Sequence, residues 1–468
     1  MTIERDVMKY DVLIVGGGPA GLSAAIKIKQ IATRENKEIS VCLVEKGAEV
    51  GSHILSGAVI DPVALSELIP DWKEKGAPLN TKVTKDIFNL FSETRNLKIP
   101  HWLMPPIMSN KQNYIVSLGE LCVWLSKEAE NLGIEIYPGF TAQEPIFNDK
   151  QELVGILTGD MGRDSDGNET VNYAAGIEIR AKYSLIAEGT RGSITKIIEK
   201  KLSLRKNSDP QKYGLGFKEV WRLDKNKHHP GLVEHSLGWP LENDTGGGSF
   251  TYHYGEDLVS LGFVVHLDYS NPYLSPFDEF QSFKTHPKIK NLLAGAKRIS
   301  YGARAINEGG IQSWPELAFP GGVLIGCSAG MVNVPRIKGT HNAMKSGMLA
   351  AEACVEAITK PENINNKILE QYLQKLKASW VWDDLNSVRN IKPLISKYGT
   401  TLGMLFGGFE MWLASYKIKL PWTLHHEKAD HETLIDFEQA KPISYLKPDG
   451  VYTFDKLSSI SLSNIGHE

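Results

Sequence analysis

The sequence predicts an α/β protein in which one parallel sheet is interrupted by an inserted antiparallel sheet. Three stretches share a pattern of a short apolar run followed by a glycine turn, and they are Asp11–Ala25, Ser184–Ser193 and Gly321–Gly330. Parallel strands give such continuous apolar runs because both of their faces are buried. Between the second and third stretches, Gly214–Trp221 and Leu258–Val265 are strand-like runs separated by turn residues, which is typical of an antiparallel sheet. The chain therefore returns to one sheet after building another.

The first glycine turn has the spacing of a dinucleotide-binding loop. Gly16 makes the tight turn, Gly18 lets the backbone approach a pyrophosphate, and Gly21 lets helix and strand pack closely. The helix that follows offers free N–H groups and a positive dipole end to phosphates. The next apolar run, Val41–Val44, ends at Glu45, whose carboxylate can accept hydrogen bonds from a ribose. Together these features predict a dinucleotide site.

Composition narrows the class of protein. With 468 residues, 42% apolar and 23% charged, the chain can bury the cores of two or three domains. A net charge of −3 argues against nucleic acid as a partner. The four cysteines are far apart and form no CxxC pair, so we expect reduced thiols and no metal site; they are Cys42, Cys122, Cys327 and Cys354. The sequence contains no uninterrupted run of about 20 apolar residues, so it predicts no membrane-spanning helix.

Two apolar segments remain that an ordinary core does not require. Prolines exclude a regular helix or a central strand in Ile99–Met108, although it is rich in large apolar residues. The segment Tyr398–Lys417 is apolar but too short to span a bilayer. Both could simply pack on the core. Aromatic residues and lysines at the end of the second segment favour a monotopic membrane surface.

Two further loops have residue patterns that can place backbone close to a ligand. Asp244–Phe250 contains three consecutive glycines, which indicate either a hairpin turn or a loop that approaches a ligand closely. The loop Asn333–His341 leads into a predicted helix over Asn342–Ile358. The N-terminal N–H groups of that helix can face a developing anion on a flavin.

The whole plan resembles the glutathione-reductase-type FAD-binding fold, and the sequence is similar to the electron-transfer flavoprotein:ubiquinone oxidoreductase family along nearly its full length. The matching stretches are GGGPAGLSAA, HILSGAVIDP, DWKEKGAPLN, GWPLENDTGGGSF, NPYLSPFDEFQSFKTHP, YGARAINEGGIQS, GCSAGMVNVPRIKGTHNAMKSG and KPDGVYTFDKLSS. The resemblance implies a discontinuous FAD-binding domain (1–75, 110–200 and 300–395). It also implies a quinone-binding, membrane-associated domain (76–109 and 201–299) and a C-terminal helical, membrane-contacting and tail segment (396–468).

The resemblance also assigns site residues. The expected FAD contacts are Val15, Gly16, Gly18, Pro19, Ala20, Gly21, Glu45, Lys46, Gly189, Gly326, Ser328, Lys338, Gly339 and Thr340. Many flavoproteins have an aspartate where this chain has Cys327, so the ribityl contact is expected from backbone or from Ser328. Thr340, which can donate a hydrogen bond near the flavin N1/O2 edge, and Gln312 are assigned as catalytic. The quinone is expected at Gly247 and Gly248.

Membrane contact is implied at about 77–100 and 398–416, whereas the residue pattern itself pointed to Trp102–Met108. Neither a signal core nor an arginine-rich leader precedes the first strand. The expected location is therefore the surface of a respiratory membrane. This would be the bacterial cytoplasmic membrane, or the mitochondrial inner membrane if the chain is eukaryotic and processed.

The implied activity is electron transfer from reduced electron-transfer flavoprotein through FAD to ubiquinone. The family carries a C-terminal ferredoxin-like domain with a 4Fe–4S cluster, but its cysteine ligands are absent from these residues. Electrons would then come from a separate ferredoxin-like subunit or directly from the donor, or the chain is a truncated form. Two alternatives are a reductase of an isoprenoid double bond, similar to the geranylgeranyl reductases, and an assembly subunit with a vestigial flavin.

Overall fold

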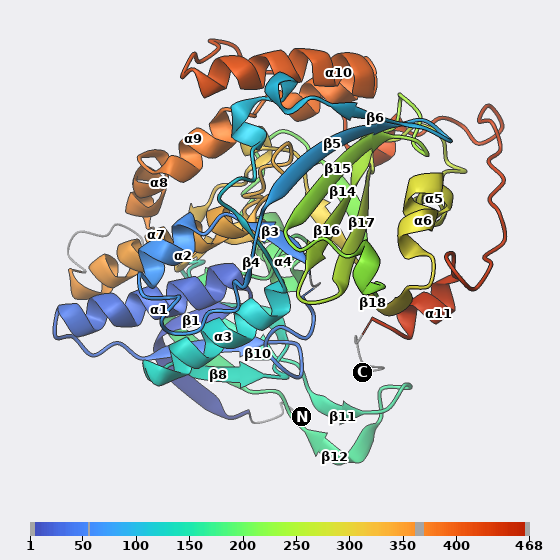
Figure 1. Cartoon of the computed structure of the whole chain (residues 1–468). Coiled ribbons are helices and arrows are strands. Elements are labelled where there is room, and N and C mark those ends of the chain that lie inside the picture. The colour runs from blue at the N-terminus through green and yellow to red at the C-terminus, as the bar shows by residue number, and fades with distance from the viewer. Residues whose placement is uncertain (1–4, 55–56, 361–368, 464–468) are drawn as a thin grey trace.

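The computed structural model describes residues 5–54, 57–360 and 369–463 and places two large sheets beside each other (Figure 1). The strands of the first sheet are β1 (Val7–Val15), β2 (Val41–Glu45), β8 (Glu135–Pro138), β9 (Ala142–Phe147), β10 (Leu153–Thr158), β13 (Glu178–Ile186), β19 (Ala318–Phe319) and β20 (Gly322–Leu324). They follow the order β19-β20-β13-β1-β2-β8, with β10 joined to β13 and to β9. β20, β13, β1, β2 and β8 are parallel, so the three predicted returns of the chain lie on neighbouring strands.

Helices pack on this sheet and bury its central strands. Leu13 and Ile14 on β1 point to opposite faces, and both are fully buried. The helices of this unit are α1 (Pro19–Arg34), α2 (Val63–Leu68), α3 (Leu118–Asn131), α4 (Ser193–Lys201), α7 (Thr340–Thr359), α8 (Glu370–Lys377) and α9 (Trp380–Asn386). α1 packs against α3 and α7. The close approach of α1 and α7 requires a glycine, because a Cβ on Gly347 would lie 2.2 Å from the Ala20 carbonyl oxygen.

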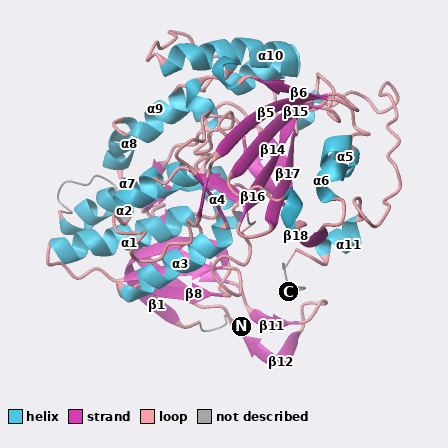
Figure 2. Cartoon of the chain, viewed as in Figure 1, coloured by secondary structure: helices cyan, strands magenta, loops and turns pink. Residues whose placement is uncertain are grey.

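The second sheet confirms the predicted antiparallel insertion (Figure 2). Its strands are β5 (Lys85–Phe91), β6 (Asn96–Ile99), β14 (Tyr213–Arg222), β15 (Leu232–Gly238), β16 (Gly247–Tyr254), β17 (Leu258–His266) and β18 (Lys297–Asn307). They follow the order β18-β14-β17-β16-β15-β5-β6. One pairing differs from the expectation, because β5 joins β15 in parallel. The segment 85–99 therefore extends this sheet.

The two faces of the second sheet differ in character. Phe217 and Phe263 project toward α5 (Pro276–Thr285), where both stack against Phe280, and α6 (Pro287–Leu293) lies beside α5. The register places the alternate residues on the opposite face, which is rich in glycine. Those glycines are Gly214 and Gly216 on β14, Gly248 on β16 and Gly262 on β17. This face turns toward the first sheet, because Lys218 on it donates a hydrogen bond to the Gly57 carbonyl.

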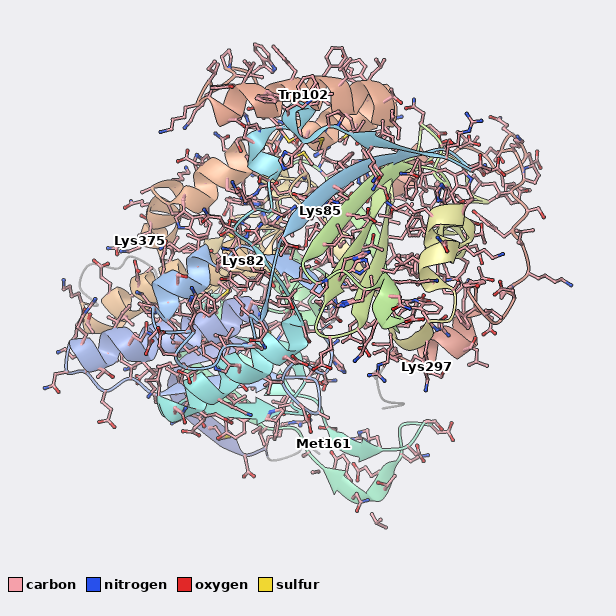
Figure 3. The ribbon with its side chains drawn as sticks, in the orientation of Figure 1. Lys82, Lys85, Trp102, Met161, Lys297 and Lys375 are labelled. Atoms are coloured by element: carbon pink, nitrogen blue, oxygen red, sulfur yellow. The ribbon has the colours of Figure 1, made fainter. Side chains whose placement is uncertain are left out.

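Smaller elements complete the chain. β3 (Ala58–Ile60), β4 (Thr81–Lys82) and β7 (Tyr114–Val116) form a small sheet, and the hairpin of β11 (Met161–Arg163) and β12 (Glu169–Ala174) projects from the body (Figures 1 and 3). The short 3₁₀ turns are η1 (His101–Leu103), η2 (Pro106–Met108), η3 (Lys225–Lys227), η4 (Ile311–Ser313), η5 (Gly326–Ser328) and η7 (Asp430–Thr433). Near the C-terminus lie α10 (Ile391–Ser415), which is kinked at Gly399, and α11 (Lys456–Ile460).

Residue patterns placed several of these elements correctly. The proline-rich segment before Met108 contains only η1 and η2, as the prolines require. The predicted helix at Asn342 begins two residues earlier, at Thr340. Among the described residues, no helix is both long enough and apolar enough to cross a membrane.

A buried ion cluster holds α5 to the second sheet. Lys284 is fully buried and lies 3.0 and 3.1 Å from the two carboxylate oxygens of Glu219. Arg298 donates to the same carboxylate at 3.0 Å, and the Trp221 indole N–H donates to it at 2.9 Å. Every member therefore has a partner, which offsets the cost of burying the charges.

Lys284→Met should lower the free energy of unfolding by about 3 kcal/mol, because removing one partner leaves the buried Glu219 carboxylate less well compensated. Urea unfolding followed by tryptophan fluorescence measures the change. Lys419→Met is the control, since Lys419 pairs with Asp383 where both side chains are largely exposed, and its effect should be small. Equal stability of the two variants would contradict a structural role for the Lys284 cluster.

Candidate functional site

The first glycine turn is closed at both ends and open in the middle. Gly16 has φ +111°, and a Cβ there would lie 2.4 Å from the Ala187 carbonyl oxygen. A Cβ on Gly21 would lie 2.1 Å from the Gly16 carbonyl oxygen. Around Gly18, in contrast, no heavy atom lies within 4 Å of the Cβ position. The backbone is therefore accessible at the position where the spacing places a pyrophosphate.

Helix α1 presents an uncapped N-terminus next to this opening. Gly18 is its N-cap residue, no side chain caps it, and Pro19 occupies the first turn. Ala20 follows directly on the same turn. The N–H groups and the positive dipole end are therefore available to an anion.

Glu45 is positioned by backbone groups at the end of β2. The Gly17 N–H donates to one carboxylate oxygen and the Gly47 N–H to the other, both at 2.8 Å. A carboxylate has acceptor sites beyond these two, so the predicted ribose contact fits this arrangement. Val15 is buried at the end of β1, and Lys46 is exposed just after β2.

The second and third glycine turns meet through Ser328. Its hydroxyl accepts from the Gly189 N–H at 3.1 Å and lies 3.3 Å from the Gly189 carbonyl oxygen, to which it can donate. Gly189 has open space around its Cβ position, and Gly326 packs on α1 with a Cβ position 2.8 Å from the Cβ of Ala20. Ser328 thus joins the two loops, a contact that spacing along the sequence could not reveal.

Helix α7 offers a second uncapped N-terminus beside these turns. Gly339 is its N-cap residue without a side-chain cap, and Thr340 is its half-buried first residue. The preceding Lys338 is buried, and its ammonium donates to Asn110 Oδ1 and to the Arg336 carbonyl. Burial lowers the pKa of Lys338 to about 7. A cation that can lose its charge therefore lies at the start of α7.

Gln312 has a clear structural role. Its amide nitrogen donates to the carbonyls of Arg389 and Leu424 at 2.7 and 2.8 Å. Its Oε1 is buried and has no hydrogen-bond partner among the described residues. The side chain thus ties η4 to the C-terminal segment, and its catalytic role stays a prediction.

The glycine triplet lies where the β15–β16 hairpin loop enters β16. The pairing of β15 with β16 ends at Ser236 and Ser249, so Gly247 and Gly248 pair only with β17. Both glycines are half-buried. The hairpin interpretation and the ligand interpretation of the triplet are therefore compatible, since one side of this backbone lacks a strand partner.

A cavity of 190 Å³ opens on the glycine-rich face of the second sheet. Its lining residues are Lys85, Asp86, Ile87, Phe88, Lys98, Ile99, His101, Met104, Met108, Ser109 and His235. The register places His235, Phe250 and Gly248 on one face, and Gly248 lies two residues before Phe250. Hydrogen bonds connect one lining residue, Asp86, to the start of α7, because Asp86 accepts from Asn110, which in turn accepts from Lys338.

Sequence reasoning missed two polar side chains of this face, the buried His235 and the half-buried Lys218. Burial lowers the pKa of His235 to about 3, so the ring is neutral and lies 2.8 Å from the Tyr252 hydroxyl. Burial lowers the pKa of Lys218 to about 8, and its ammonium lies over the Phe250 ring. The alternation Gly214-x-Gly216-x-Lys218 was the available signal, because it places the lysine on the glycine face.

The cysteines take no part in these arrangements. All four are free thiols; Cys42, Cys122 and Cys354 are buried and Cys327 is half-buried. In the part of the chain that the structure describes, no three histidine, cysteine, aspartate or glutamate side chains gather closely enough to hold a metal ion.

Comparisons with known proteins agree with this geometry. A family model described as FAD binding domain matches residues 11–64, and one described as ETF-QO, ubiquinone-binding, matches residues 213–306. An electron transfer flavoprotein-ubiquinone oxidoreductase from Pseudomonas aeruginosa is 52% identical over 468 residues, which cover 100% of this chain and 84% of that protein. The mitochondrial protein of the same name from Homo sapiens is 50% identical over 479 residues, covering 100% of this chain and 76% of that protein.

Solved structures show the same fold at low sequence identity. A geranylgeranyl bacteriochlorophyll reductase-like protein from Thermoplasma acidophilum gives a TM-score of 0.62 at 17% identity, covering 88% of this chain and 97% of that one. A variant of a flavin-dependent brominase gives 0.59 at 16% identity, covering 87% and 97%. At these identities the likeness concerns the fold alone.

The open phosphate loop, the two uncapped helix ends and the matched FAD-binding model define an FAD-dependent oxidoreductase. The sequence identity of about one half along the entire chain identifies the family more specifically than the fold and the site do. The chain belongs to the electron transfer flavoprotein-ubiquinone oxidoreductase family.

Gly18→Ala should leave the fold intact and weaken FAD binding at least about tenfold. The φ of −84° suits alanine and the Cβ meets no protein atom, but the methyl group occupies the space of the pyrophosphate. FAD titration of the apoprotein measures the affinity, and circular dichroism checks the fold. Gly408→Ala is the control, because its Cβ position is also open. Full FAD affinity in Gly18→Ala would exclude the proposed phosphate position.

Proposed function

We propose that this chain passes electrons from reduced electron-transfer flavoprotein through FAD to ubiquinone at a membrane surface. One observation supports this most strongly: the sheet matched by the ubiquinone-binding model turns its glycine-rich face toward the FAD-binding unit. Lys218 on β14 bonds to the Gly57 carbonyl, and Arg304 on β18 bonds to the His53 carbonyl. A quinone on that face would lie between the sheet and the flavin.

The quinone ring is proposed to lie against Gly247 and Gly248. A flat ring can contact backbone directly at glycines, and this backbone lacks a partner strand on one side, where the Leu237 and Leu241 side chains lie next to it. The neighbouring cavity supplies apolar walls, including Met104 and Met108. These side chains suit an isoprenoid tail, because methionine adapts to irregular apolar ligands.

FAD, when bound, supplies the carrier that exchanges electrons singly or in pairs. The residues proposed to hold it are the predicted ones on the three glycine turns and at the start of α7. The N-terminus of α7 at Thr340 would stabilise negative charge on the reduced ring. Lys338 adds a nearby cation whose charge depends on pH, since burial lowers its pKa to about 7.

On the donor side, we propose that electrons reach FAD either directly or from a separate ferredoxin-like subunit. The four free cysteines of the chain offer no 4Fe–4S ligand set by their spacing. Adding purified electron-transfer flavoprotein, with and without a ferredoxin-like protein, distinguishes the two routes by the rate of flavin reduction.

The membrane surface is proposed to be formed by α10 and η1. Leu405 and Phe409, one helical turn apart, are 66% and 64% exposed, and Trp102 on η1 is 75% exposed (Figure 3). The Trp412 indole N–H donates to the Leu103 carbonyl, which joins the two elements. Exposed apolar side chains gathered on one surface are typical of a membrane contact. The proposed location is a respiratory membrane of a bacterium or a mitochondrion; one relative is bacterial and another is named as mitochondrial.

The direct test is reduction of a short-chain ubiquinone by the FAD-loaded protein. The flavin is first reduced photochemically, and its reoxidation by the quinone is then followed by absorbance. Reoxidation coupled to quinol formation is expected. Product analysis with polyprenyl substrates examines the rival activity, and loss of an isoprenoid double bond without quinol formation would favour the reductase.

Gly248→Ala should slow quinone reduction about tenfold while FAD stays bound. Its Cβ would lie 2.9 Å from the Ser236 carbonyl oxygen, a milder conflict than at Gly247, where φ is +149° and the Cβ would lie 2.2 Å from the Val264 carbonyl oxygen. The methyl group would press on the Ser236 carbonyl and on the Leu237 Cδ2 at 3.0 Å, and the resulting shift of this strand end would move the backbone away from the ring. Gly159→Ala is the control, because its Cβ meets only a side-chain atom at 3.6 Å. Unchanged quinone kinetics would place the ring elsewhere.

The double variant Leu405→Ser, Phe409→Ser should bind phospholipid vesicles at least about tenfold more weakly, because each lost apolar side chain removes roughly 1.5–3 kcal/mol of burial. Vesicle co-sedimentation measures binding, and bound FAD checks integrity. The matched control is Val171→Ser, Leu446→Ser, which removes two exposed apolar side chains elsewhere. If the two double variants bind equally, α10 is not the contact surface.

A further inference from the structure

A buried group of charged side chains lies directly beside the glycine triplet. Glu308, at the end of β18, and His266, at the end of β17, face each other with 3.5 Å between the Glu308 Oε2 and the His266 Nε2. Lys392 on α10 lies 3.8 Å from the same Glu308 oxygen and 3.0 Å from the His266 Nδ1. All three side chains are at least nine-tenths buried. The FAD contacts predicted above include none of them.

Glycines bring these side chains down onto the sheet. A Cβ on Gly246 would lie 2.1 Å from the His266 Nδ1, and a Cβ on Gly214 would lie 2.1 Å from the Glu308 Oε1. Gly246 immediately precedes the two glycines proposed to contact the quinone. By the register, Gly214 pairs with His266, and β17 separates it from β16. Adjacent strands lie about 4.8 Å apart, so the Glu308 carboxyl is within about 10 Å of the glycine triplet.

The donor and acceptor capacities of these side chains fix the directions of their hydrogen bonds. A lysine ammonium only donates, so the His266 Nδ1 is the acceptor and its Nε2 carries the proton. Burial lowers the pKa of His266 to about 3, so the ring is neutral. Its Nε2–H points toward the Glu308 Oε2, which has no hydrogen-bond partner among the described residues. The Glu308 carboxyl is thus buried, and its Oε2 is available for a hydrogen bond.

The cluster connects to the protein surface. Lys392 also contacts both carboxylate oxygens of Asp268, at 2.8 and 2.9 Å. Asp268 accepts a hydrogen bond of 2.6 Å from Ser396, which is exposed on α10. A continuous series of contacts therefore runs from solvent through Asp268 and Lys392 to Glu308.

We propose that Glu308 is the internal proton donor for the quinone bound at the glycine triplet, and that Lys392, held by Asp268, returns the proton from solvent. This inference rests on the proposed function. Reduction of a quinone to a quinol adds two electrons and two protons. The electrons come from the reduced flavin. The O–H bond of the Glu308 carboxyl breaks and an O–H bond forms on a quinone oxygen, directly or across one water.

The Glu308 carboxylate must then take up a proton again. The Lys392 ammonium gives a proton to the Glu308 carboxylate and regains one from solvent on the side of the exposed Ser396, while the ionised Asp268 holds Lys392 in place. The second proton of the quinol follows the same route. His266 acts as a positioning residue, because its Nε2–H faces the Glu308 Oε2 at 3.5 Å and its neutral ring adds no charge to the site.

The surroundings hold Glu308 protonated near neutral pH. Burial raises the pKa of its carboxyl to about 8, outweighing the attraction of Lys392. The charged or titratable groups that face it or its partners are Lys392 on α10, His266 and Asp268 at the end of β17, Lys212 before β14, Asp430 on η7, and His426 beside Gly309. The acid form is the donor, so quinone reduction should decline as the pH rises above about 8.

The test compares two oxidants of the photoreduced, FAD-loaded protein in a stopped-flow instrument between pH 6 and pH 9. Ubiquinone-1 needs protons, whereas ferricenium accepts electrons alone. In Glu308→Gln, oxidation by ubiquinone-1 should slow about 100-fold and lose its pH dependence, while oxidation by ferricenium keeps the wild-type rate. Glu308→Asp should recover part of the quinone rate. In the wild type, the quinone reaction should be slower in D₂O than in H₂O.

Glu279→Gln is the matched control. Glu279 is a buried carboxyl whose pKa is raised by burial, but it lies on α5, on the other face of the sheet, and accepts from Tyr445. Its quinone kinetics should match the wild type. A wild-type protein that fails to oxidise with ubiquinone-1 refutes the proposed function itself. A wild-type protein that does so while Glu308→Gln keeps its rate and pH profile overturns the proton donor.

If Glu308→Gln does not retain FAD, the wild-type measurements decide. A quinone rate that is constant from pH 6 to pH 9 and equal in H₂O and D₂O would exclude rate-limiting proton delivery from a buried acid. A rate that falls above about pH 8 and shows a solvent isotope effect would support it, because ferricenium oxidation in the same protein provides the proton-independent reference.

Discussion

Close backbone packing between α1 and α7 is the contact on which the site depends. A side chain at Gly347 would meet the Ala20 carbonyl at 2.2 Å, and one at Gly326 would meet the Ala20 side chain at 2.8 Å. Because these positions lack a Cβ, the two helix N-termini and the turn at Gly326 converge on one space. Ser328 then bonds this turn to Gly189. Three chain segments separated by more than a hundred residues thus form one cofactor cradle.

Close packing at glycines also shapes the second sheet. Its glycine-rich face lets Phe250, His266 and Glu308 lie flat against the backbone, whereas the opposite face carries the large aromatic core under α5. A face without protruding side chains can approach the flavin unit closely, and it can bury polar groups there. The α5 face therefore combines an aromatic core with the paired charges around Glu219, and the glycine-rich face buries the polar groups around Glu308.

Helix α10 links the surface of the molecule to this interior. Its kink at Gly399 lies against Asn243, whose carbonyl accepts from the Thr400 N–H at 2.8 Å. The first turns of the helix carry Lys392 into the buried cluster, while the turns after the kink expose apolar side chains. One helix therefore connects the proposed membrane contact, the glycine triplet and the proton route.

By itself, the sequence determined the nucleotide fold, the antiparallel insertion and the glycine spacing, because these depend on local periodicity and on residues without side chains. It could not determine the parallel pairing of β5 with β15, since partners distant along the chain leave no local signal. Nor could it reveal the cluster around Glu308, whose members come from β17, β18 and α10. Only the tertiary structure decides which charged side chains are buried together, because burial and neighbouring charges set their protonation states.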